Sequence, residues 1–131
     1  NQRLSAEAKL YYAMCILKLM SKSLQSGEVQ TLPGLSKELK LGYDSLEALL
    51  DKMAKANMVQ RLAGRGWVMV RVPEHVQALE VYRLFVFDPE QAPSIQNCGE
   101  INAWLARLEK NNMTASDTSL QALFNNVTIS R

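Results

Sequence analysis

Two leucine-rich helical patterns separated by a tight break most restrict what this sequence can fold into. The first runs over residues 31–40, where Thr31 supplies a side-chain oxygen as N-terminal cap. The second has apolar residues at the i, i+3, i+4, i+7 spacing of an amphipathic helix and ends at Asn57, which tolerates left-handed backbone. Because only Leu41-Gly42 separates them, the two patterns predict a helix-turn-helix.

A β-hairpin is predicted directly after the second helix. Met58–Leu62 and Trp67–Val72 are short runs rich in strand-forming residues. Between them, Ala63-Gly64-Arg65-Gly66 contains two glycines that can supply positive φ in a tight turn. Pro73 ends the hairpin, and the apolar residues over 76–87 predict a further helix that closes the core.

The start of the chain predicts one more long helix. Ser5 is a good N-cap, and helical apolar spacing continues until Ser26-Gly27. The order is therefore helix, helix-turn-helix, hairpin. This order predicts a winged helix domain, mainly α with a small β-hairpin, in which the hairpin is the wing and Gly42–Asn57 is the recognition helix.

A linker and a helical appendage follow the winged helix. The segment DPEQAPSIQNCG has two prolines and little periodicity, which is typical of a linker. We therefore expect a winged helix domain over 1–87, a linker over 88–99 and a C-terminal helical appendage over 100–131. The appendage should contain one helix around Trp104 and a second beginning at Ser116 or Asp117, followed by a polar tail from Asn125.

Composition and reactive residues give no support to an enzyme. The 15 basic and 13 acidic residues leave a net charge of +2, too mild to predict nucleic-acid or membrane-surface binding from charge alone. The lone His75 lacks an evident catalytic partner, and Cys15 and Cys98 are far apart in sequence. We name no catalytic, cofactor-binding or metal-ligating residue. We expect Cys15 to be a reduced, buried thiol rather than one half of a disulfide.

The recognition helix has the wrong charge for reading DNA. Three carboxylates, Asp44, Glu47 and Asp51, outnumber its two lysines, so phosphates would be repelled. The basic wing could still touch one phosphate track, which keeps nucleic-acid contact open as an alternative. The side chains that could make such contact are Lys52, Lys55, Arg61, Arg65 and Arg71.

The appendage offers a candidate interaction face. Trp104, Leu105 and Leu108 share one face of the first appended helix, and an isolated helix of about 12 residues is marginal in water. We expect both appended helices to pack on the side of the first helix that carries Tyr11, or on the same surface of a second copy.

Residues 31–85 resemble two groups of bacterial winged helix sequences. The resemblance rests on TLPGLSKELKLGYDSLEALLDKMAKANMVQR and GRGWVMVRVPEHVQALEVYRLF, and extends to INAWLARLEK and TSLQALF. One group is the Rrf2-type transcription regulators. The other is the cytoplasmic C-terminal domain of the YihY/BrkB inner-membrane proteins, also labelled ribonuclease BN.

Three observations favour the membrane family. The chain opens with Asn1-Gln2-Arg3 and no methionine, as expected of a domain preceded by membrane spans. Only Cys98 stands where many of the regulators place three cysteines for an iron–sulfur cluster, and one ligand cannot hold a cluster. The acidic recognition helix suits a domain that no longer reads DNA.

The resemblance implies a non-catalytic domain on the cytoplasmic side of the bacterial inner membrane, attached through preceding spans. It would act by protein contact or self-association, without a cofactor. A DNA-binding, Rrf2-like regulator is the alternative. A tRNA-processing ribonuclease is a third reading, for which these residues provide no nucleophile or metal cluster.

Overall fold

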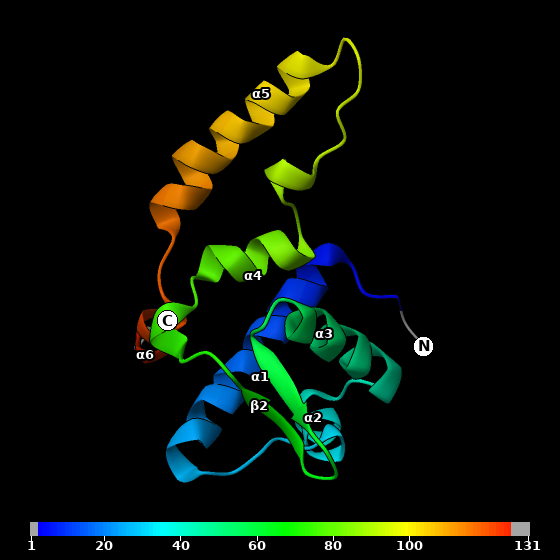
Figure 1. The fold of residues 1–131 in the computed structure, drawn as a ribbon, viewed down its shortest axis with the longest axis vertical. Coiled ribbons are helices and arrows are strands. Elements are labelled where there is room, and N and C mark those ends of the chain that lie inside the picture. The colour runs from blue at the N-terminus through cyan, green and yellow to red at the C-terminus, as the bar shows by residue number, and fades with distance from the viewer. Residues whose placement is uncertain (1–2, 127–131) are drawn as a thin grey trace, which may run out of the picture.

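The computed structural model describes residues 3–126, and these form a helical body with one two-stranded sheet and a projecting C-terminal arm (Figure 1). The α-helices and strands, in chain order, are α1 (Ala6–Ser26), α2 (Leu32–Leu39), α3 (Tyr43–Lys55), β1 (Val59–Leu62), β2 (Gly66–Met69), α4 (Ala78–Phe85), α5 (Gly99–Leu108) and α6 (Leu120–Asn125). Short 3₁₀ turns lie at Pro73–His75, Pro89–Gln91 and Thr114–Ser116, and a π turn at Glu109–Met113. The predicted mainly α winged helix fold is confirmed.

Helix α1 is the central helix of the body, as its sequence pattern predicts. The Ser5 hydroxyl accepts a hydrogen bond from the Ala8 amide at 3.1 Å, and Gly27 ends the helix at φ 76°. Ile16 and Leu17 are completely buried, because α2, α3, α4 and β2 all pack against α1. The predicted cap and end of this helix are both confirmed.

The helix-turn-helix forms where expected, with an unexpected residue at its turn. Thr31 caps α2 by accepting from the Gly34 amide at 3.1 Å. Helix α2 then ends at Leu39, its C-cap Lys40 has a left-handed φ of 56°, and Gly42 is the N-cap of α3. A lysine in left-handed backbone is uncommon, so sequence reasoning placed the break at Leu41-Gly42 and not at Lys40.

The wing is a short antiparallel hairpin. Val59 pairs with Met69 and Leu62 with Gly66, and Asn57 enters the hairpin at φ 60°, as its left-handed tolerance predicts. The second strand is shorter than the predicted Trp67–Val72 and starts one residue earlier. Regular pairing ends at Met69, although the Val70 amide still donates to the Met58 carbonyl at 3.0 Å.

A single apolar core joins α1 to the helix-turn-helix, the wing and α4. Among the described residues its buried members come from every one of these parts, and they include Leu120 of α6, which is completely buried. Helix α6 therefore shares the core of the winged helix. The expected division into 1–87, 88–99 and 100–131 stays a prediction, and residues 127–131 of the expected tail lie outside the described residues.

The C-terminal arm departs from expectation in two ways. Its second helix begins at Leu120 with Ser119 as N-cap, not at Ser116 or Asp117, because the Asp117 carboxylate accepts from the Leu79 amide at 2.8 Å instead of capping α6. The expected docking of both arm helices on α1 is also wrong for α5, which lies beyond α4 and away from α1 (Figure 1).

Candidate interaction site

Helix α5 exposes an apolar stripe to solvent. Ile101 is 50% exposed, Trp104 54% and Leu108 37%, while Leu105 beside them is half-buried. None of the ten residues of α5 is fully buried. Contiguous large apolar side chains are unusual on the surface of a monomeric protein and mark binding surfaces. We call Ile101, Trp104 and Leu108 the α5 stripe.

The other side of α5 faces the body and is held by polar contacts. The Asn102 side-chain amide donates to the Pro93 carbonyl at 3.2 Å. Just past α5, Glu109 accepts from Arg83 of α4, with Nε 2.7 Å and Nη2 2.6 Å from its Oε2 atom. Because Asn102 and Glu109 lie about 100° around the helix from the stripe, these contacts turn the stripe outward.

The arm is also fixed where the chain returns to the body. The Leu120 amide donates to the Val76 carbonyl at 2.8 Å, and the Ala78 amide donates to the Thr118 carbonyl at 2.7 Å. With the Asp117 contact to α4, these bonds anchor the end of the arm beside the start of α4. Helix α5 is therefore held at both ends while its stripe stays open.

The recognition helix presents its acidic residues to solvent. Asp44, Glu47 and Asp51 are all exposed on α3, together with Lys52 and Lys55. The Lys52 ammonium lies 5.9 Å from the centroid of the Phe85 ring in α4, close enough for a cation–π contact. One of the two lysines is thus directed toward α4, which leaves the solvent face of α3 dominated by carboxylates.

The three wing arginines fall into two groups. Arg61 and Arg65 are exposed on the hairpin, whereas Arg71 lies beyond β2 and is paired with Glu80. Its Nη1 and Nη2 atoms each lie 3.0 Å from a Glu80 oxygen, and Nη2 also donates to the His75 carbonyl. These bonds occupy the guanidinium that the sequence suggested for phosphate contact.

The Arg71–Glu80 pair also shifts the pKa values of both side chains. The hydrogen bond from Arg71 lowers the pKa of the Glu80 carboxyl, against partial burial that raises it, and the Gln77 amide adds a second stabilising hydrogen bond. The same pair raises the pKa of Arg71. Sequence reasoning missed this pair, although a glutamate three residues after the N-cap residue Gln77 is a recognisable capping signal.

A groove runs between the wing and the start of the helix-turn-helix. Its lining includes Pro33, Glu47, Arg61, Arg65 and Trp67. The Glu47 carboxylate therefore shares this groove with the two exposed wing arginines and offsets part of their charge. The groove is less favourable for a phosphate backbone than the arginines alone would indicate.

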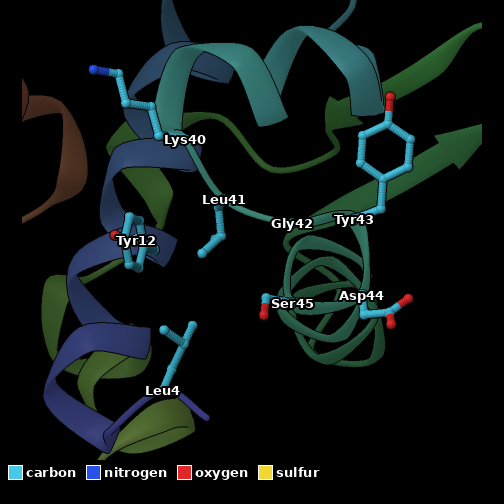
Figure 2. Close-up of a pocket in the computed structure, with 8 residues that line it drawn as sticks. All are labelled: Leu4, Tyr12, Lys40, Leu41, Gly42, Tyr43, Asp44 and Ser45. Atoms are coloured by element: carbon cyan, nitrogen blue, oxygen red, sulfur yellow. The ribbon is translucent and has the colours of Figure 1, made fainter. Parts of the chain in front are cut away.

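A second hollow lies at the turn of the helix-turn-helix. Figure 2 shows Leu4, Tyr12 and Leu41 on one side of it, with the first turn of α3 on the other. Its described lining contains no histidine or cysteine. The lining residues are Leu4, Tyr12, Lys40, Leu41, Gly42, Tyr43, Asp44 and Ser45.

Clustered metal ligands do not appear within residues 3–126. No group of three or more His, Cys, Asp or Glu side chains there could hold a metal ion. His75 is exposed at the end of the Pro73–His75 turn, and Cys15 and Cys98 are free, partly buried thiols. The structure does not bring His75, Cys15 and Cys98 together into one site.

The chain is similar in sequence to bacterial membrane proteins. It is 34% identical over 87 residues to a UPF0761 membrane protein of Nitrosospira multiformis, covering 66% of this chain and 20% of that protein. It is 31% identical over 75 residues to one of Chromobacterium violaceum, covering 57% and 18%. The chain thus spans about a fifth of the length of these relatives. No protein-family model matches it.

The fold is similar to solved transcription regulators. The cysteine regulator CymR of B. subtilis matches with a TM-score of 0.69 at 17% identity, over 98% of this chain and 100% of that one. CymR of Staphylococcus aureus matches with 0.65 at 21% identity, over 92% and 98%. At these identities the likeness shows the fold alone.

The sequence similarity and the fold similarity point to different groups of proteins. Within the described residues, no helix is both long and apolar enough to span a membrane. The sequence similarity nevertheless points to membrane proteins, and the architecture is that of the Rrf2-type winged helix. The resemblance inferred from the sequence is therefore confirmed: the chain is similar to a part of the UPF0761 membrane proteins, the YihY/BrkB family, and has the winged helix fold of Rrf2-type regulators.

Proposed function

We propose that this chain is a non-catalytic winged helix domain of a multi-span bacterial inner-membrane protein of YihY/BrkB type. It lies on the cytoplasmic side, is attached through spans outside this chain, and works by protein contact. The membrane-protein relatives support this proposal, since the chain matches only about a fifth of their length.

The observation that carries the proposal is the α5 stripe. Trp104 is 54% exposed on a helix that the structure holds at both ends. Covering a large aromatic side chain is worth on the order of 2 kcal/mol, so a protein surface that covers the stripe gains binding energy without reshaping the arm. Since α5 is already ordered, little further ordering cost opposes binding.

The charges on the winged helix face support the same conclusion, because they disfavour DNA binding. The solvent face of α3 is dominated by carboxylates, Arg71 is engaged with Glu80, and Glu47 shares the groove of the remaining wing arginines. A surface of this kind releases few counterions from DNA. The face that reads DNA in many winged helix proteins is therefore poorly suited to that task here.

Site-specific photocrosslinking of the membrane-embedded parent protein tests this function. A benzophenone amino acid replaces Trp104 and, as the matched control, Tyr11, which is 69% exposed on α1. Illumination should give a protein adduct from position 104 and little from position 11. Leu108→Glu, which places a charge in the stripe, should abolish the adduct because an unpaired charge cannot be buried cheaply.

The outcomes separate a specific contact from random capture. An adduct that forms at position 104 and disappears with Leu108→Glu supports the proposal. Absence of an adduct at 104, equal adducts from both positions, or an adduct that survives Leu108→Glu overturns it.

A DNA-binding regulator is the second candidate. Arg61 and Arg65 are exposed on the wing, and the solved proteins that share this fold include transcription regulators. If the chain binds duplex DNA, these two arginines must supply most of the phosphate contact. Direct titration with DNA decides between this candidate and protein contact.

A further inference from the structure

We propose that the outer side of α1 rests on the anionic headgroups of a lipid bilayer. This inference rests on the proposed function, because that function places a bilayer next to the domain. It goes further by assigning one surface of the domain to lipid and thereby orienting the domain on the membrane. We call Tyr11, Lys18 and Lys22 the α1 face.

The α1 face lies on the side of the helix that is turned away from the core. Positions 11, 18 and 22 fall within about 40° of one another around the helix, and the line that they form is about 16 Å long. The buried residues Ile16 and Met20 lie on the opposite side. Tyr11 is 69% exposed and both lysines are exposed, so the described part of the chain leaves this line open to a flat partner.

Positive charge is concentrated in the part of the chain that contains the α1 face. Residues 3–40 carry six basic and three acidic side chains, a net charge of +3, whereas residues 41–131 carry nine and ten, a net charge of −1. Glu7 is the only carboxylate of α1, and it lies in the first turn, where it stabilises the helix dipole. Neither Lys18 nor Lys22 forms an ion pair within residues 3–126. Both ammonium groups are therefore available to an anionic surface.

Tyr11 favours a bilayer over nucleic acid as the anionic partner. A tyrosine has an apolar ring and a polar hydroxyl, and such side chains are enriched at the boundary between lipid and water. The Tyr11 ring packs edge-on against Tyr12, with the ring centroids 6.1 Å apart, and most of it stays exposed. A duplex bound through the winged helix would instead meet the carboxylates of α3.

The α1 face is separate from the α5 stripe. Helix α4 packs against α1, and α5 lies beyond α4 (Figure 1). Because α1 and α5 lie on opposite sides of α4, a bilayer that contacts the α1 face does not cover Trp104. Lipid at α1 and protein at α5 can therefore be bound at the same time.

The small number of charges sets the concentration range of the test. Each lysine close to an anionic bilayer strengthens binding about fivefold, so Lys18 and Lys22 together contribute about 25-fold. For the chain in solution we therefore expect half-maximal binding on the order of 1–10 mM accessible lipid at low salt. Attachment of the parent protein to the membrane raises the effective concentration of the face at the bilayer.

Sedimentation of the 131-residue chain with phosphatidylglycerol vesicles, at about 20 mM salt, tests the inference. Lys18→Gln/Lys22→Gln should weaken binding at least tenfold. Lys52→Gln/Lys55→Gln, which removes two exposed lysines of α3, has the same net charge and should stay within about threefold of the wild type. Tyr11→Ser should weaken binding roughly threefold, because the ring no longer enters the lipid–water boundary. Phosphatidylcholine vesicles, which carry no net charge, should not bind the chain.

Three results in this assay overturn the inference. They are no binding to phosphatidylglycerol vesicles, equal losses from the two pairs of lysine substitutions, and binding that Trp104→Ala removes. The third result would place lipid on the α5 stripe and would also count against protein contact there. Binding to duplex DNA that Lys18→Gln/Lys22→Gln removes would assign the α1 face to nucleic acid and overturn the inference as well.

The photocrosslinking experiment on the parent protein separates this inference from the proposed function. The benzophenone at position 11 should give a phospholipid adduct, while position 104 gives its protein adduct. A protein adduct or no adduct at position 11 overturns the inference but leaves the proposed function standing. Loss of the protein adduct at position 104 removes the proposed protein contact, and a phospholipid adduct at position 11 would then still support the α1 face as a lipid surface.

Discussion

Substitution of two leucines in one short helix tests how the arm is anchored. Leu120 and Leu123 both lie in α6, but Leu120 is completely buried in the core, whereas Leu123 is 40% exposed. If α6 is an integral part of the winged helix core, truncating Leu120 must destabilise the whole domain. The same truncation at Leu123 controls for helix propensity and side-chain chemistry.

The magnitude follows from burial. Leu→Ala at a fully buried site costs about 2–5 kcal/mol, through lost transfer energy and the cavity left behind. We expect Leu120→Ala to lower the free energy of unfolding by about 3 kcal/mol, and the melting temperature by roughly 10 °C for a chain of this size. Leu123→Ala should cost less than about 1 kcal/mol, because much of its side chain is already in water.

Urea denaturation followed by far-ultraviolet circular dichroism measures both values. The protein should be kept at about 5 µM, because a low concentration disfavours association and lets the folded monomer be compared. If the two variants lose the same stability, or if Leu120→Ala loses less than about 1 kcal/mol, α6 is not part of the core and the described anchoring of the arm is wrong.

Three further substitutions test local features of the fold. Glu80→Gln should lower the free energy of unfolding by about 1 kcal/mol at neutral pH. Because Arg71 lowers the folded-state pKa of Glu80, the extra stability of the wild type should disappear as the pH falls below the ordinary range of a carboxyl group. A stability difference that does not change with pH would contradict the pairing. Lys40→Gly should raise stability by about 0.5–1 kcal/mol, since φ there is 56°, and a lower melting temperature would refute the strain argument. Asp117→Asn should cost about 1 kcal/mol through its weakened bond to the α4 amide, and unchanged urea unfolding would count against that contact.

Most of the body could be predicted from local sequence signals. Ser5, Thr31 and Asn57 each occupy the cap or left-handed position that their side chains favour. These signals are short-range, so they survive in the folded chain whatever else packs around them. Lys40 escaped prediction because no local signal marks a lysine as left-handed.

The arm shows where sequence reasoning fails. The apolar spacing of α5 predicts that Trp104 and its apolar neighbours share one face of the helix, but periodicity does not say what covers that face. Docking depended on contacts between distant residues, such as Arg83 with Glu109 and Asp117 with Leu79. Such polar contacts hold α5 away from α1, and no spacing rule reveals them.

Titration of the chain with duplex DNA tests the central claim most directly. Fluorescence anisotropy of a labelled duplex should show no saturable binding below about 100 µM protein at about 20 mM salt, because carboxylates dominate α3. A Glu47→Lys/Asp51→Lys variant provides the comparison and should gain binding that weakens as salt rises. Micromolar binding by the wild type, with a salt slope that falls by roughly one unit in Arg65→Ala, would contradict the account and assign the winged helix to DNA.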